Sequence, residues 1–285
     1  HGGFDMTAAD AVIDLTGLVD SAWVVDVLQR LRNKSLVRSY EAPEFPGEPR
    51  CRHYGGTRQY ARRKLEESGL VAGAMARHAA YYLKLGDYWR SAAGDRRAVE
   101  GRRRIEVELP NIIAVHRRSL AADPGPEDVE RAMRLALAIF PVIAVSGPFA
   151  GFLKLLDVTL EAASINAVPA ELHGALHLAR GHIRRIHGDA VGAGADLRTV
   201  LTLAREAKDR ALAGQALTEM ATLRMVMGQD APADDMLRRA LGIHRETGDI
   251  KWQGRTLMAM GNVCLMRGEL EKARACFERA LPRFK

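Results

Sequence analysis

The sequence of 285 residues is poor in cysteine, in aromatic residues and in long apolar runs. Its three cysteines, Cys51, Cys264 and Cys276, are too few for the disulfide framework of a small secreted domain, so we expect a reduced, cytoplasmic protein. The longest apolar run, residues 135–145, contains Pro141 and is far shorter than the roughly 20 residues that a membrane-spanning helix needs. We therefore expect this run to form a buried helix.

Sequence signatures of catalysis are absent as well. The chain has no GxxxxGK[ST] phosphate-binding loop, no GxSxG nucleophile elbow, and no HExxH or CxxC motif. His173 and His177 stand at positions i and i+4, but no carboxylate lies at ligand spacing from them. The sequence therefore predicts no enzymatic activity, no cofactor and no metal site.

Basic side chains are concentrated in one segment of the chain. Residues 50–120 hold 16 basic and 7 acidic side chains, whereas residues 1–49 hold 4 and 8. A basic segment of this kind can contact nucleic acid, an anionic ligand or the acidic face of another domain, and it can equally be a solvated helix surface. The charge distribution alone leaves these alternatives open.

The residues that the chain has in abundance favour helices. Apolar residues make up 47% of the sequence but aromatic residues only 6%, so a core would be built from Ala, Leu, Val and Met, which suit helix packing better than strands. A period of 40 residues runs through the second half and predicts a repeat architecture. The columns in register are Gly174, Gly214 and Gly254; Gly188, Gly228 and Gly268; Ala193, Ala233 and Ala273; Leu197, Leu237 and Phe277; and Val200, Ala240 and Ala280.

Each 40-residue unit is expected to contain two helices. The first helix would end at the glycine at position 188, 228 or 268, which can adopt a left-handed conformation. The second helix carries apolar residues at i, i+4 and i+7. The segment "MGNVCLMRGELEKARACFERAL", residues 260–281, resembles a tetratricopeptide repeat. Residues 127–145 and 147–163 fit a degenerate upstream copy, so a superhelix is expected over 125–285.

The first 70 residues have a different pattern. We expect a short helix over 7–12 with Thr7 as its N-cap, and a second helix over 21–37 that begins at Ser21 and buries Trp23 and Leu28. Strands over 35–42 and 50–54 would form a hairpin, and a helix over 57–69 would follow. Helix, helix, hairpin and helix is the outline of a winged helix, here without its first helix.

The segments "VLQRLRNKSLV" and "TRQYARRKLEESG" resemble the winged helix of bacterial signal-transduction ATPases with numerous domains (STAND, LuxR-type). In those regulators a helical linker and a tetratricopeptide sensor follow the winged helix. The resemblance implies a mainly α fold with a truncated winged helix over 1–70, a helical linker over 71–122 and tetratricopeptide-like repeats over 125–285. Because the first residue is His1, we expect a fragment of a longer polypeptide that has an upstream nucleotide-binding or kinase module.

The resemblance also implies a function and candidate sites. It predicts a non-catalytic sensor module that binds a protein, a peptide or a small ligand on the repeat groove, and that contacts the upstream module within the same polypeptide. By register with the family, the groove positions are His182, Arg185, Gln215, Thr218, Thr222, Arg255 and Asn262. The alternative is a DNA-binding regulator, in which the basic front half contacts phosphates. Its candidate contacts are Arg30, Arg32, Lys34, Arg58, Arg62 and Arg63.

Overall fold

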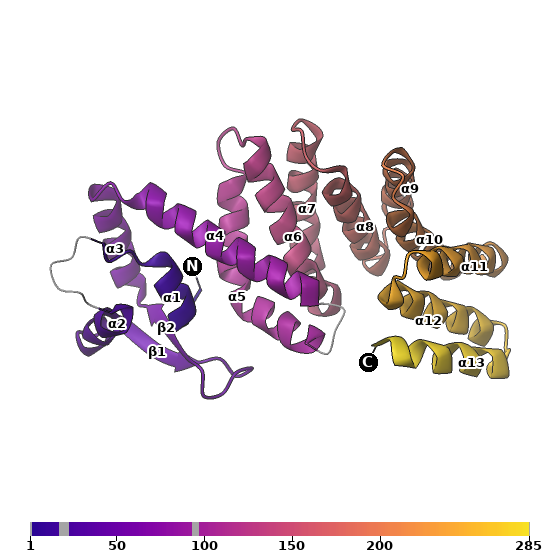
Figure 1. The fold of residues 1–285 in the computed structure, drawn as a ribbon, viewed down its shortest axis with the longest axis horizontal. Coiled ribbons are helices and arrows are strands. Elements are labelled where there is room, and N and C mark those ends of the chain that lie inside the picture. Colours follow the sequence, from indigo (N-terminus) through magenta and orange to yellow (C-terminus); the bar gives the residue numbers. More distant parts are fainter. Residues whose placement is uncertain (1, 17–22, 93–96, 285) are drawn as a thin grey trace.

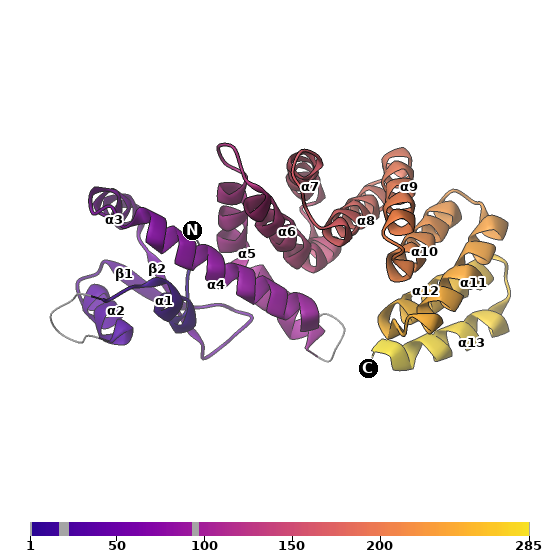
Figure 2. The same ribbon diagram turned by 45° about the horizontal axis from the view of Figure 1, so that its top comes forward.

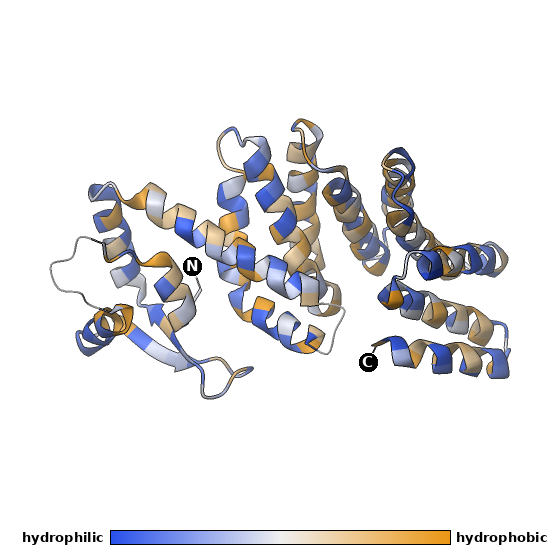
Figure 3. Ribbon diagram, in the orientation of Figure 1, coloured by the Kyte–Doolittle hydropathy of each residue, from blue (hydrophilic) through white to orange (hydrophobic). Residues whose placement is uncertain are grey.

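The computed structural model describes residues 2–16, 23–92 and 97–284. Within these residues the chain is an elongated arc of helices with one two-stranded sheet near its N-terminal end (Figure 1). Figure 3 shows apolar and polar residues alternating along most helices of the arc, as expected of helices that pack through one face. The prediction of a mainly α fold is confirmed.

The N-terminal unit has the predicted order of elements. It consists of α1 (Met6–Val12), α2 (Val24–Asn33), β1 (Val37–Glu41), β2 (Pro49–His53) and α3 (Gly55–Glu67). The two strands pair antiparallel with Ser39 opposite Cys51. The hairpin was predicted with strand limits that differ by only one or two residues.

Several local predictions in this unit are wrong. Asp5, rather than Thr7, caps α1, because its carboxylate accepts a hydrogen bond from the Ala8 amide. Helix α2 ends at Asn33, because Ser35 takes a left-handed conformation and the chain then enters the strand. Trp23 lies at the N-cap of α2 and is 76% exposed, so it does not join Leu28 in the core. The predicted cap Ser21 lies outside the described residues.

Helix α3 departs from the winged-helix prediction in its packing. None of its residues is buried, so it contributes nothing to a core shared with α1 and α2. It ends just before Gly69, which has a φ of +72°, and the chain continues into α4 (Val71–Ser91). The order of the elements agrees with the predicted outline, and the winged helix itself stays a prediction.

Four long helices form most of the largest core among the described residues. Helices α4, α5 (Ala98–Ser119), α6 (Pro126–Ser146) and α7 (Phe149–Ser164) surround a cluster that includes the fully buried Ile112, Met133 and Leu156. The apolar run over 135–145 lies within α6 and most of it is buried, which confirms the prediction of a buried helix. Among the described residues, no helix has both the length and the apolar character that crossing a bilayer requires.

Six helices follow in the region where the 40-residue repeat was predicted. They are α8 (Ala170–Ile186), α9 (Ala190–Glu206), α10 (Arg210–Val226), α11 (Asp230–Glu246), α12 (Ile250–Met266) and α13 (Leu270–Ala280), and a short 3-10 helix (Leu281–Phe284) ends the description. Gly188, Gly228 and Gly268 end α8, α10 and α12 with φ values of +90°, +71° and +72°. The left-handed turn expected of these glycines is confirmed.

The repeated small residues lie where helices approach closely. Ala193, Ala233 and Ala273 have exposed fractions of 0%, 0% and 1%. A Cβ atom placed on Gly214 would lie 2.8 Å from Cε1 of His244, which no side chain tolerates without a shift. The 40-residue period in the sequence therefore reflects the close contacts between helices in each repeat.

Candidate functional site

The repeat helices form two layers. Helices α6, α8, α10 and α12 pack in succession against one another, whereas α7, α9, α11 and α13 pack on them and not closely on each other. The helices that approach each other form the tighter, inner layer of the arc, and the others form its outer layer (Figure 2). Residues that project from α8, α10 and α12 away from the outer layer therefore share one surface, which we call the inner face.

A buried carboxylate lies at the centre of the inner face. Glu219 on α10 is 6% exposed, and its two oxygens accept hydrogen bonds from His182 (3.0 Å) and Arg185 (3.3 Å) of α8. Burial alone would raise the pKa of Glu219. The His182 hydrogen bond and the charges of His182, Arg185 and Arg255 outweigh burial and lower the pKa to about 2. Glu219 is therefore an anion at neutral pH.

Aromatic rings border this cluster on both sides. Phe140 of α6 makes an edge-to-face contact with His182, with ring centroids 5.5 Å apart. The Arg255 guanidinium carbon lies 4.9 Å from the centroid of the Trp252 ring, both on α12. Within the described residues Arg255 makes no hydrogen bond or ion pair, and Nε of the largely buried Arg185 has no partner. The inner face thus presents an oriented guanidinium with unused donors.

Three of the seven predicted groove residues lie close together, and the other four do not join them. His182, Arg185 and Arg255 lie around Glu219. Gln215 is half-buried, and its amide donates to Asp249 at 3.4 Å, whereas Asn262 is exposed. The Thr222 hydroxyl donates to a carbonyl of its own helix. These placements leave the role of each side chain in binding as a prediction.

The prediction of Thr218 as a groove residue is wrong. Thr218 is 3% exposed, and its hydroxyl lies 3.3 Å from Nε2 of His244 and 2.9 Å from the Thr256 hydroxyl. It therefore belongs to a polar contact inside the helix stack. Glu219, the next residue, faces the inner surface instead. Like Trp252 and Phe140, it was not among the residues predicted for the groove.

His177 is part of an ion network, and the centroid of the His173 ring lies 5.2 Å from that of His177. Nδ1 of His177 lies 2.9 Å from Oδ1 of Asp196. Arg180 donates a hydrogen bond to the same oxygen, and Arg184 donates one to Oδ2 of Asp196. Asp196 is 2% exposed on α9, so this network holds α8 against α9. Among the described residues no group of three possible metal ligands is present.

The six basic residues predicted to contact nucleic acid are all exposed but do not form one site. Arg30 and Arg32 lie on α2 and Lys34 follows it, whereas Arg58, Arg62 and Arg63 lie on α3. Helix α2 packs on β1 and α1, and α3 projects away from it at the other edge of the unit (Figure 1). Arg62 and Arg63 form ion pairs with Glu66 (3.0 Å) and Glu67 (3.7 Å), which offset part of their charge.

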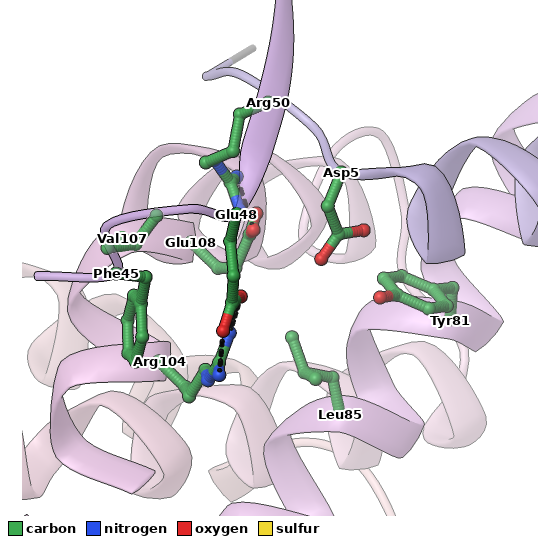
Figure 4. A pocket seen from close by; sticks show the side chains of 9 residues that line it. All are labelled: Asp5, Phe45, Glu48, Arg50, Tyr81, Leu85, Arg104, Val107 and Glu108. Carbon is green, nitrogen blue, oxygen red and sulfur yellow. Dashed lines mark hydrogen bonds and ion pairs between the residues drawn. The ribbon is translucent and has the colours of Figure 1, made fainter. Parts of the chain in front are cut away.

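A buried polar joint connects the N-terminal unit to α5 (Figure 4). Arg50 of β2 forms an ion pair with Glu108 of α5, and their exposed fractions are 7% and 5%. Arg50 also donates to the Gly3 carbonyl at 3.1 Å, and Asn111 donates to the same carbonyl at 2.9 Å. At the edge of the joint, Arg104 forms a more exposed ion pair with Glu48. These contacts fix the hairpin on the helical stack.

Comparison with known proteins agrees with the repeat fold. Residues 212–285 match the tetratricopeptide repeat family, whose members generally mediate protein–protein interaction rather than catalysis. No curated protein matches the chain in sequence. The similarity to this family therefore covers residues 212–285, which lie in α10 to α13 and the 3-10 helix that follows.

Several solved structures are similar to this chain in fold. BtubC (BKLC) from P. vanneervenii has a TM-score of 0.51 and 17% identity, and the alignment covers 79% of this chain and 85% of that one. A putative kinesin light chain with tetratricopeptide-like repeats from Podosopora anserina has a TM-score of 0.48 and 13% identity over 72% and 95%. A STAND protein with a tetratricopeptide repeat sensor from Pyrococcus horikoshii has a TM-score of 0.48 and 18% identity. That alignment covers 99% of this chain but only 42% of the other protein.

Proposed function

We propose that this chain is a non-catalytic sensor module of a larger cytoplasmic regulator, and that it binds an acidic segment of a partner protein on its inner face. The observation that carries the proposal is the cluster of His182, Arg185 and Arg255 around Glu219 on three successive inner helices. The tetratricopeptide region over 212–285 supports an interaction role, because such repeats generally bind proteins or peptides.

The chemistry of the cluster favours a carboxylate on the partner. Arg185 already donates to Glu219, whereas the Arg255 guanidinium carbon lies 4.9 Å from the centroid of the Trp252 ring and its donors make no hydrogen bond within the described residues. A guanidinium held in this way loses little side-chain entropy on binding and can donate two parallel hydrogen bonds to one carboxylate. An aspartate, a glutamate or a C-terminal carboxylate of an extended peptide meets this requirement.

The N-terminal unit is proposed to be a truncated winged helix of the STAND type. The order of its elements supports this proposal, and the buried joint at Arg50 and Glu108 would make it move together with α5. A partner on the inner face could then alter the contact between this chain and an upstream module. It can do so only if it binds one arrangement of the chain and the module more tightly than the other arrangement.

A peptide-display selection against the wild-type chain tests the proposed function. We expect the selected peptides to be enriched in acidic residues, and their affinity to fall by about tenfold or more in Arg255→Ala, the loss typical of a charged hydrogen-bonded pair. Arg205→Ala removes an exposed arginine of α9 and is the matched control. Selected peptides that bind Arg255→Ala and the wild type equally would contradict the proposal.

The competing assignment, a DNA-binding regulator, is tested with the same protein. Duplex DNA binding through α3 should weaken steeply with salt and be lost in Arg62→Glu/Arg63→Glu. The ion pairs of these two arginines with Glu66 and Glu67 weigh against this assignment. Salt-sensitive DNA binding that is lost in this double variant but kept in Arg255→Ala would establish it in place of the inner-face site.

A further inference from the structure

The outer side of the stack contains an apolar groove that the proposed function does not use. Its volume is about 560 Å³, within the range typical of small-molecule sites. Its two walls are α5 and α7, which both pack on α6 but not closely on each other, and Ile139 and Ile143 of α6 form its floor. This groove is independent of the inner face.

The walls of the groove are stripes of apolar residues at helical spacing. Helix α5 contributes Leu109 and Ile113, its C-cap residue is Leu120, and α7 contributes Phe152, Leu155 and Val158. Val158 is 52% exposed, although it is large and apolar. A long apolar strip that is open to solvent and bounded by two helices is typical of a surface that a ligand covers.

Glycine at position 151 explains part of the opening. Gly151 lies on the groove side of α7, and a Cβ atom placed there would lie 3.9 Å from the nearest atom, Cγ of Pro148. The position is helical and not left-handed, so a side chain there costs no backbone strain. A larger residue at 151 would therefore occupy the groove without unfolding α7.

The charges at the groove are of one sign. Arg117 of α5 and Lys154 of α7 border it from opposite walls, both exposed, and within the described residues neither makes an ion pair or hydrogen bond. Among the residues that the structure describes, no carboxylate lines the groove. The third polar residue, His116, is buried, and its pKa is lowered to about 4 by that burial and by Arg117, so it is neutral at pH 7.

We propose that this groove binds an amphipathic carboxylate, whose apolar body lies between α5 and α7 and whose anionic head contacts Arg117 and Lys154. Polar ligands such as sugars or nucleotides would find too few hydrogen-bonding groups along the walls. A cationic amphiphile would be repelled by both basic side chains. The lining thus selects for an apolar body and for a negative head.

Fluorescence of cis-parinarate, which increases in an apolar site, provides the direct measurement. We expect the wild-type chain to bind cis-parinarate below its micellar concentration, and decanoate to displace it more effectively than decanol does. Arg117→Gln/Lys154→Gln should weaken decanoate binding about tenfold, as expected for two surface ion pairs, and leave decanol unchanged. Gly151→Leu should weaken both ligands because it fills the groove.

Two further variants keep the test decisive. Arg198→Gln removes an exposed arginine of α9 outside the groove and should bind as the wild type does. Val158→Glu places an anion at an exposed wall position, where folding is undisturbed, and should repel decanoate. The proposal is overturned if cis-parinarate does not bind, if Gly151→Leu and Val158→Glu bind it like the wild type, or if decanol competes as well as decanoate. Occupation of the groove by an acidic amphipathic peptide in place of the carboxylate would overturn it too.

Discussion

Replacing Glu108 by alanine tests how the N-terminal unit is held on the helical stack. The ion pair between Glu108 and Arg50 is almost fully buried, with side-chain exposures of 7% and 8%. Burial alone would lower the pKa of Arg50, but the Glu108 charge, together with hydrogen bonds to Tyr40 and Glu108, more than offsets this and raises the pKa, so the guanidinium stays charged. Glu108→Ala leaves this cation buried without its partner, which costs about 3–5 kcal/mol.

The same joint supplies a matched control and a second variant. Arg104→Gln breaks the Arg104–Glu48 ion pair, whose side chains are 28% and 49% exposed, and should cost about 1 kcal/mol or less. Arg50→Met/Glu108→Leu removes both buried charges, so no unpaired ion remains and most of the loss should be recovered. The recovery will be incomplete, because Arg50 also donates to the Gly3 carbonyl and Asn111 donates to Glu108.

The measurement must resolve the N-terminal unit from the repeats. Repeat stacks often unfold in parts, so we would combine urea unfolding with hydrogen exchange of the β1 and β2 amides. In Glu108→Ala we expect exchange of these amides to accelerate by about 100-fold or more, the equivalent of roughly 3 kcal/mol, while α10 and α12 keep their protection. If Glu108→Ala destabilised the joint no more than Arg104→Gln does, the reasoning from buried charge would be refuted.

Two further predictions concern the repeats. Gly261→Ala should destabilise the chain by about 1–3 kcal/mol in urea unfolding, because the added Cβ would overlap the ring of Phe277. Gly242→Ala should stabilise the chain by about 0.5–1 kcal/mol, because no atom lies within 4 Å of the added Cβ. Equal effects of the two substitutions would contradict the inference of close contact at Gly261. Glu219→Gln should cost about 2–3 kcal/mol at neutral pH. Because the folded-state pKa of Glu219 is lowered to about 2, its contribution is present above its unfolded pKa near 4.5 and is lost as the pH falls toward 2. The difference in unfolding free energy between wild type and variant should therefore narrow over that pH window, and a constant difference would show that the charge of Glu219 is not the cause.

The repeat fold could be predicted from the sequence because its signals are local and recur. Turn glycines such as Gly188 and Gly228 recur every 40 residues, and each adopts the left-handed conformation that its position requires. A second signal in the sequence is the aspartate that precedes several repeat helices. Asp189, Asp209 and Asp249 all cap repeat helices, each accepting a hydrogen bond from the backbone amide three residues later. Their spacing would have fixed the helix starts directly.

The N-terminal unit was harder to predict, because its packing depends on contacts that are distant in sequence. The strand and turn pattern identified the hairpin, but only the structure shows that α3 has no buried residue and that Arg50 pairs with a side chain of α5. A basic residue within a strand has the same appearance in sequence whether it is solvated or buried against a carboxylate. The sequence pattern therefore identified the elements of this unit but not the contacts that hold them on the helical stack.

The inner-face site shows why residue register predicts a helix face only approximately. Thr218 and Glu219 are adjacent, and register selected the threonine, but the threonine hydroxyl is held inside the stack by His244 and Thr256. A buried hydroxyl and a buried carboxylate each need partners, and those of Glu219 come from α8, one helix pair earlier. An acidic residue in the apolar segment "LTEMATL" is itself a signal, because it is stable there only if cations from neighbouring helices neutralise it. Looking for its partners among the basic residues of the preceding inner helix would have identified His182 and Arg185 together with Glu219.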